Sequence, residues 1–214
     1  MSSKLAFPGR SAWRLGLIAA LTTALLAGVH ALTSEKIAHQ AQELESRRLQ
    51  QVLPESLYNN NPRDDLLLVK DEAHFKHSAV VRIYRARDDG QPVGLVLRHT
   101  APDGYNGEIV LLTGILANGR ISGVRVVHHK ETPGLGDPIE LSRSTWILGF
   151  SGRSLEDPVV DHWGVQRDGG AFDQFTGATI TPRAVVRAVQ RALAYYQIHG
   201  DALFAETTGN GAGQ

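Results

Sequence analysis

The chain has 214 residues, enough for one folded domain with a hydrophobic core and some additional segments. Its 22 basic and 22 acidic residues cancel, so it has no excess positive charge that would attract nucleic acid. It contains no cysteine and its single methionine is Met1, which excludes disulfides, iron–sulfur clusters, thiol catalysis and a mature His/Met haem site. Any redox chemistry is therefore expected to use an organic cofactor.

An apolar segment near the amino terminus predicts a membrane anchor. Leu15–Leu32 carries no formal charge other than one on His30 when protonated, and as a helix it would be about 27 Å long, close to the hydrocarbon thickness of a bilayer. Only basic charges precede it, which predicts a cytoplasmic segment at 1–14, a transmembrane helix at 15–33 and export of the remainder. A cleaved signal peptide is the alternative, but the apolar core exceeds the usual length of about 7–15 residues.

The next segment predicts a helical stalk and linker at 34–62. Ser34 can cap a second helical segment, which is rich in helix formers and ends before Pro54. Its apolar residues are too sparse for a coiled coil. The polar run Tyr58–Asp65 marks a boundary. The expected folded domain is 63–204, followed by a disordered tail at 205–214.

Four stretches rich in apolar residues, separated by turn signals, predict antiparallel strands in the folded domain. Asp89-Gly90 and Asn118-Gly119 are typical of tight turns that join such strands. A run with mixed periodicity after Pro138 indicates a short helix packed on the sheet. The predicted fold class is α+β, with an antiparallel sheet packed by helices. The expected strands are 79–86, 93–99, 108–116 and 121–129.

The last helix is expected to start with Thr181 as its N-cap and Pro182 as its first residue. Thr179 would lie in the loop before the helix, where Gly177 lets the backbone approach a ligand. Free N–H groups and the positive end of a helix favour a phosphate group there. By spacing alone, however, Thr-Gly-x-Thr before a helix more commonly reflects ordinary capping and turn formation.

A resemblance strengthens the phosphate interpretation. DQFTGAT, at Asp173–Thr179, resembles the Asp-x-x-Ser/Thr-Gly-Ala-Ser/Thr signature of proteins that carry FMN on a threonine or serine through a phosphoester bond. With GYNGEIVLLTGI at Gly104–Ile115 and HHKETPGLGDPIE at His128–Glu140, the chain resembles the G subunit family of Rnf/Rsx-type ion-translocating electron transport complexes. The related C subunit of the sodium-translocating NADH:quinone reductase shares the flavin motif, but the other two segments favour the Rnf family. Pro138 departs from the lysine expected in this family.

The resemblance implies that Thr179 is the attachment point of a covalent FMN. An ApbE-type flavin transferase would attach the FMN, and the divalent metal of that reaction belongs to the transferase. The resemblance also implies other membrane subunits as partners, in the bacterial inner membrane, with the carboxyl-terminal domain in the periplasm. Residues implied in shaping the attachment loop or in contacting the flavin are Asp173, Thr176, Gly177, Ala178, Thr132, Gly134, Leu135 and Trp146.

The expected role is an electron carrier without substrate turnover of its own. Two alternatives remain at this point: a membrane-anchored scaffold subunit without flavin, and a subunit of the related sodium-translocating reductase. No metal site is predicted, because the adjacent His128 and His129 would face opposite sides of a strand.

Overall fold

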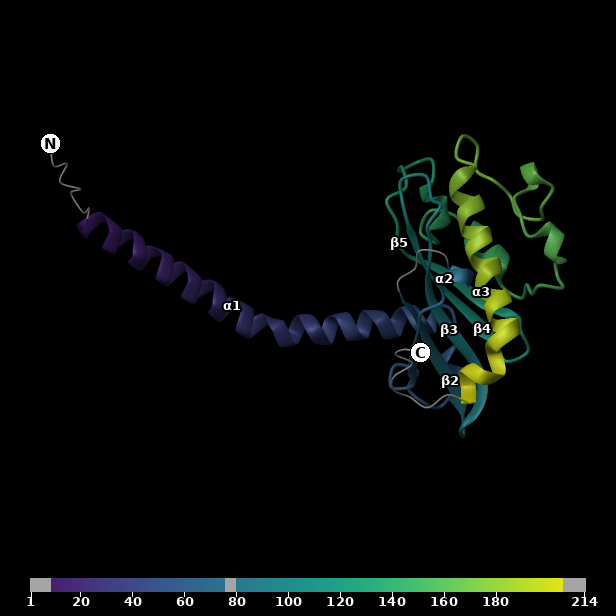
Figure 1. Cartoon of the computed structure of the whole chain (residues 1–214), viewed down its shortest axis with the longest axis horizontal. Helices are drawn as coiled ribbons and strands as arrows, with labels where there is room; N and C mark the ends of the chain where they lie inside the picture. Colours follow the sequence, from purple (N-terminus) through teal and green to yellow (C-terminus); the bar gives the residue numbers. More distant parts are fainter. Residues whose placement is uncertain (1–8, 76–79, 206–214) are drawn as a thin grey trace. The chain divides into compact units, whose positions relative to one another are not determined.

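The structure is a computed structural model that describes residues 9–75 and 80–205 (Figure 1). The chain divides into two compact units between Glu45 and Ser46. Residues 1–8 of the predicted cytoplasmic segment and 206–214 of the predicted tail lie outside the described residues.

The first unit contains most of helix α1, Gly9–Gln50. Within α1, Ala12–Ser34 has a mean hydropathy of 2.0 and no buried residues, so it is long and apolar enough to cross a membrane by length and composition. The predicted restart at Ser34 is wrong, because α1 is continuous there. The Ser34 hydroxyl donates to the Ala31 carbonyl at 3.4 Å within the helix instead of capping a new one.

The second unit is built on a five-stranded antiparallel sheet in the order β1-β2-β3-β4-β5. The antiparallel α+β prediction is confirmed, and the four expected strands correspond to β2 to β5. Strand β1, a short strand of four residues at the edge of the sheet, was not predicted. The strands are β1 Leu66–Val69, β2 Val81–Asp88, β3 Gln91–Ala101, β4 Ile109–Leu116 and β5 Ile121–His128.

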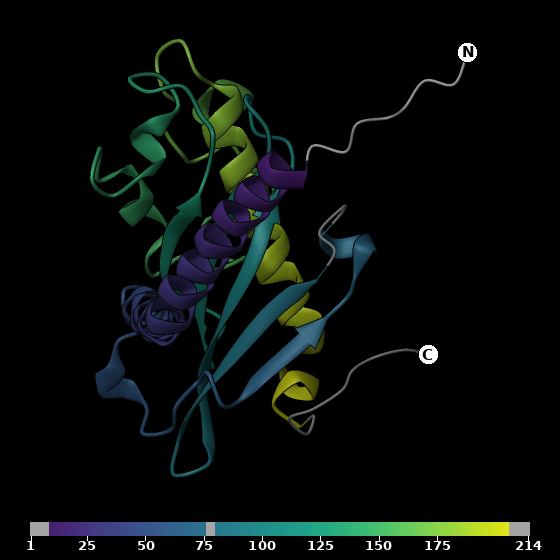
Figure 2. The same ribbon diagram turned by 90° about the vertical axis from the view of Figure 1, so that its left-hand side faces the viewer.

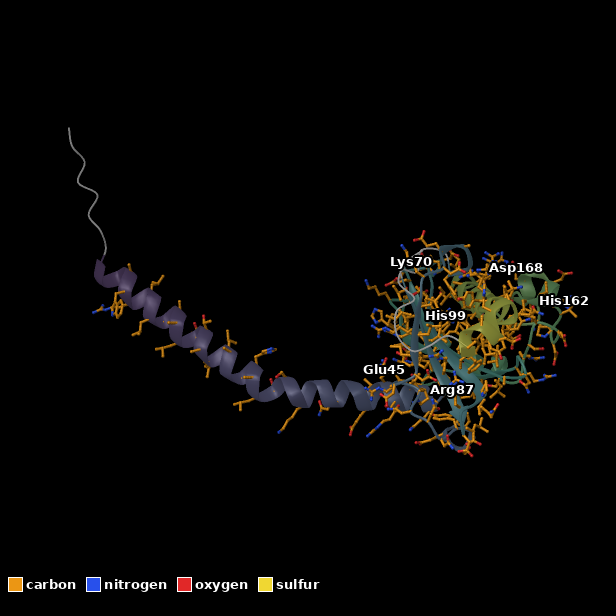
Figure 3. The ribbon with its side chains drawn as sticks, turned by 60° about the horizontal axis from the view of Figure 1, so that its bottom comes forward. Glu45, Lys70, Arg87, His99, His162 and Asp168 are labelled. Carbon is orange, nitrogen blue, oxygen red and sulfur yellow. The ribbon has the colours of Figure 1, made fainter. Side chains whose placement is uncertain are left out.

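Helix α3, Ile180–Ala205, lies along one face of the sheet (Figures 1 and 2). Its apolar side chains recur at helical spacing, and they pack on strand residues such as Leu95 and Leu111 to form the main core. His99 of β3 is buried within this layer, where its Nε2 lies 2.8 Å from Thr113 Oγ1, and it lies within the body of the domain in Figure 3. Burial, together with the charge of Arg191, lowers the pKa of His99 to about 3.

The opposite face of the sheet is also covered. Leu49, Val52 and Leu53 are buried there against Tyr84 and Val96. The predicted start of the folded domain at residue 63 therefore lies too far along the chain. The end of α1 and the turn that follows belong to the second compact unit, because their apolar side chains fill this second core.

The long connection between β5 and α3 contains short 3-10 turns where the sequence predicted a short helix. Two of them are η2, Asp137–Ile139, and η3, Trp146–Phe150. Phe150 stacks on Phe172 with ring centroids 4.6 Å apart, and Phe172 also contacts Trp163 at 5.1 Å. This buried aromatic cluster fixes an otherwise irregular segment against the core. Further short elements are η1 Glu55–Leu57, α2 Glu72–Phe75, η4 Val160–His162 and η5 Gln166–Asp168.

Candidate functional site

A pocket lies where the loop before β4, the turn after β5 and the start of α3 meet. It encloses about 470 Å³ of empty space including its open mouth. Three segments far apart in the sequence therefore share one cavity. Its lining residues are Tyr105, Glu131, Thr132, Leu135, Gly136, Gly177, Ala178, Thr179, Ile180 and Thr181.

The TGAT loop forms a tight turn directly before α3. The N–H of Ala178 donates to the Phe175 carbonyl at 3.1 Å, and Gly177 has a φ of 80°, which favours glycine. The Arg183 N–H donates to the Thr179 carbonyl at 3.2 Å, so Thr179 occupies the capping position immediately before the first helical residue, Ile180.

The predicted N-cap at Thr181 is wrong. Thr181 lies inside α3 and is 1% exposed, and its hydroxyl donates to Glu131 Oε2 in a short hydrogen bond. A tertiary acceptor therefore uses the hydroxyl that the local pattern assigned to capping. Pro182 is the third helical residue, where its missing N–H removes no helical bond.

Glu131 joins the three segments that form the pocket. It is 4% exposed, and its Oε1 accepts the Asn106 N–H at 3.1 Å while its Oε2 accepts the Thr181 hydroxyl. Gly136 packs so closely on Glu131 that a Cβ there would lie 2.9 Å from the Glu131 side chain. The buried carboxylate therefore ties the loop before β4 and the turn after β5 to the first turn of α3.

His129 supports the same turn from β5. Its Nδ1 accepts the Glu131 N–H at 3.0 Å, so the Nε2 carries the proton and donates to Glu140 Oε1 at 2.6 Å. This hydrogen bond from His129 is the main cause of the lowered pKa of Glu140. Both His129 nitrogens are used within the turn, whereas His128 is exposed at the end of β5.

Five of the predicted site residues line the pocket together: Thr132, Leu135, Gly177, Ala178 and Thr179. Gly134 is close by, where its N–H donates to Asp137 Oδ1 at 2.6 Å and fixes the turn that presents Leu135.

The remaining predicted residues lie outside the pocket lining. Asp173 and Thr176 are exposed, and the Asp173 carboxylate accepts from Gln166 Nε2 at 2.6 Å. Trp146 packs edge-on against Phe175 at 5.1 Å and donates its indole N–H to the Asp173 carbonyl at 2.9 Å. Trp146 therefore supports the motif from outside the cavity, and flavin contact by Trp146 stays a prediction.

Sequence reasoning missed two residues of the loop before β4. Tyr105 lines the pocket with 66% of its surface exposed, and the Asn106 amide donates to Thr132 Oγ1 at 2.9 Å. Both lie in the GYNGEI stretch, which contributed to the resemblance without an assigned role. The sequence feature that could have indicated these residues is the pair of glycines, Gly104 and Gly107, on either side of them. In the structure Gly104 packs too closely on the Gly107 carbonyl to accept a side chain.

The lining residues fit a phosphorylated, planar ligand. The first N–H groups of α3, from Ile180 and Thr181, have no intrahelical acceptor, and the positive helix end favours an anion. Thr179 contributes a half-buried hydroxyl at this point. Leu135 and Ile180 are 47% and 44% exposed, and with Tyr105 they provide apolar surface for a flat ring. If FMN is bound, these residues would hold its phosphate and its ring.

Comparison with known proteins identifies the family. Residues 104–194, which include every lining residue, match the FMN-binding domain family, and residues 9–52 match the RnfG N-terminal region. The chain is 47% identical over 196 residues to the G subunit of the ion-translocating oxidoreductase complex of Pseudomonas aeruginosa, covering 92% of each chain. The chain belongs to this G subunit family.

Other relatives agree with this assignment. The G subunit of the Photorhabdus laumondii complex is 49% identical over 86% of this chain and 87% of its own length. That of Vibrio cholerae is 46% identical over 86% of this chain and 88% of its own length. The family expected from the sequence motifs is confirmed, and the match at the amino terminus favours the Rnf family over the related sodium-translocating reductase.

Proposed function

We propose that this protein is a membrane-anchored flavoprotein subunit of an ion-translocating electron-transport complex, and that it carries electrons on FMN attached covalently to Thr179. The observation that carries this proposal is the position of the Thr179 hydroxyl, in the FMN-binding domain, at a helix amino terminus and on the wall of the pocket. When bound, the FMN supplies one- and two-electron chemistry.

The pocket offers three threonine hydroxyls, and their surroundings favour Thr179. The Thr181 hydroxyl is buried and donates to Glu131, and the Thr132 hydroxyl accepts from Asn106. Thr179 instead lies in the loop before α3. Attachment would form a bond from its oxygen to the FMN phosphorus as the pyrophosphate of FAD breaks, with AMP leaving and the hydroxyl proton lost. A separate ApbE-type transferase with a divalent metal would catalyse this step.

The chain's own contribution is to hold the ring and to limit its freedom. A bond at Thr179 would keep the cofactor at the pocket during exposure outside the cytoplasm. Leu135 and Tyr105 would pack on the ring, and the other membrane subunits of the complex would be the electron donor and acceptor.

Replacement of Thr179 tests the attachment. Thr179→Ala removes the proposed ester oxygen, and replacement of a threonine at the capping position typically costs only about 1 kcal/mol of unfolding free energy. Full-length protein made with the transferase should lose all denaturant-resistant flavin fluorescence while it stays folded.

Thr176→Ala is the matched control, because Thr176 is exposed in the same loop and does not line the pocket. It should keep at least part of the flavin. A Thr179→Ala peptide that still carries the mass of FMN would refute the assignment. Wild-type protein that stays colourless in the presence of the transferase would favour a scaffold role.

We further propose that residues after the apolar segment lie in the periplasm. Three basic and no acidic residues precede Leu15, which favours a cytoplasmic amino terminus. A carboxyl-terminal fusion to a reporter enzyme that is active only in the periplasm should therefore be active, and the intact mass should include the apolar segment. Activity of a cytoplasm-specific reporter alone would reverse this topology.

A further inference from the structure

A second cluster of ligand-type side chains lies between α2 and the carboxyl-terminal half of α3. Asp71 immediately precedes α2, His74 lies within it, and His199 lies on α3. Each offers one potential ligand atom, and these atoms all lie within 4.8 Å of one another. All three residues are half-buried.

We propose that Asp71, His74 and His199 form a binding site for a divalent transition-metal ion, with Zn²⁺ as the best-matched ion. Two imidazoles and one carboxylate are ligands that Zn²⁺ accepts, and three protein ligands leave a fourth position for water.

The Asp71 carboxylate is already oriented for this role. Its Oδ1 accepts the His74 N–H at 3.0 Å, which caps α2, and its Oδ2 lies 2.9 Å from His74 Nδ1. Two ligands at about 2.0–2.1 Å from a tetrahedral ion lie about 3.3 Å apart. The Oδ2 and Nδ1 atoms therefore need to separate by only a few tenths of an ångström, with loss of any proton they share.

The two histidine rings lie close together, and both pack against Tyr195. The His74 and His199 ring centroids are 5.8 Å apart at an interplanar angle of 85°. Tyr195, one helical turn before His199, contacts both rings, at 5.4 Å from His74 and 4.6 Å from His199. Ligand atoms that are now up to 4.8 Å apart would have to approach to about 3.3 Å, a closure of at most about 1.5 Å.

The position of the cluster predicts a structural role. His199 is 19 residues beyond the start of α3, which corresponds to about 28 Å along the helix from the flavin pocket. An ion at the cluster would instead link α2 to α3, which lie side by side through the contact of Phe75 with Tyr195 at 4.9 Å. This inference does not depend on flavin attachment.

Zinc titration of the full-length, chelator-treated protein in detergent tests the site. Calorimetry should show one equivalent of Zn²⁺ bound to the wild type, and a saturating excess should raise its Tm. His199→Gln and Asp71→Asn should each weaken the affinity at least tenfold and remove most of the rise in Tm. Asp71→Asn keeps an oxygen acceptor for the His74 N–H, so α2 keeps its cap.

His162→Ala is the control, because His162 is exposed at the edge of the domain (Figure 3) and lies outside the cluster. It should bind Zn²⁺ as the wild type does. Without metal, in the presence of a chelator, each variant should have the same Tm as the wild type. This comparison separates the loss of a metal-binding side chain from misfolding. Equal Zn²⁺ affinity in the wild type and both ligand variants, or an equal loss in His162→Ala, would overturn the proposal.

Discussion

Removal of the buried Glu131 carboxylate should strongly destabilise the domain, because this side chain joins the segments that form the pocket. Its two oxygens accept the Asn106 N–H and the Thr181 hydroxyl, from segments on either side of it in the sequence. Hydrogen bonds to charged groups contribute about 1.5–3 kcal/mol each. Glu131→Ala loses both and leaves a buried hydroxyl unsatisfied, so we expect a loss of about 3–5 kcal/mol from a total of about 5–15 kcal/mol.

Urea unfolding of the full-length protein in detergent measures this loss. Trp163 is 5% exposed and reports on the core by its fluorescence. With a slope of about 2 kcal/mol per molar urea, the midpoint should fall by about 1.5–2.5 M. Glu131→Gln is the isosteric control, since its carbonyl can accept from Asn106 and its amide can donate to the Thr181 oxygen, and it should lose only about 1–2 kcal/mol. A cost below about 1 kcal/mol for Glu131→Ala would refute the tying role of this carboxylate.

Two further predictions concern stability. The pKa of His99 is about 3 in the folded protein and about 6.5 in the unfolded chain, so below pH 6.5 the unfolded chain binds more protons. As the pH is lowered from 7 to 5, His99 should therefore reduce the free energy of unfolding by about 2 kcal/mol. Between pH 7 and pH 5 the urea midpoint of the wild type should therefore fall further than that of His99→Gln. An equal pH dependence in both proteins would contradict the prediction. Gly177→Ala has room for its Cβ, with its nearest contact at 3.7 Å, and should cost only about 1–2 kcal/mol for its positive φ. Gly136→Ala should cost more, because its Cβ would lie 2.9 Å from Glu131, and the reverse order of midpoints would contradict this packing.

Local patterns were sufficient where short-range geometry determines the structure. The strands β2 and β3 were predicted because a turn signal joins two apolar stretches at Asp89-Gly90, where both residues have positive φ. Strand β1 has no such signal: Leu66–Val69 is a short run of apolar residues, and only its pairing with β2 makes it a strand. The same holds for the site: the Thr179 loop was predicted from its local motif, whereas Tyr105, which has no motif role of its own, was not.

The start of the folded domain was placed too far along the chain for a related reason. Leu49, Val52 and Leu53 are too few to predict a coiled coil, and the sequence offers no partner helix for them. Their partner is the second face of the sheet, where Tyr84 and Val96 alternate with residues that face α3. Because the strands also expose charged residues, their sequences do not indicate that both faces of the sheet are buried. The end of α1 and the turn after it, which cover the second face, could therefore not be placed from the sequence.

Burial agrees with the sequence motif in favouring Thr179 over Thr181 as the proposed attachment residue. Both are threonines at the entry to α3 that line the pocket, but Thr179 is half-buried in the turn, whereas Thr181 is 1% exposed with its hydroxyl on Glu131. Asp173 and Thr176 are exposed on the same turn, so the transferase proposed above would reach them without opening the core. The loop before the helix can then accept the flavin while the first turn behind it stays fixed. On this reasoning Thr181 remains unmodified even when Thr179 is removed, because exposing its oxygen would first require breaking the Glu131 contact.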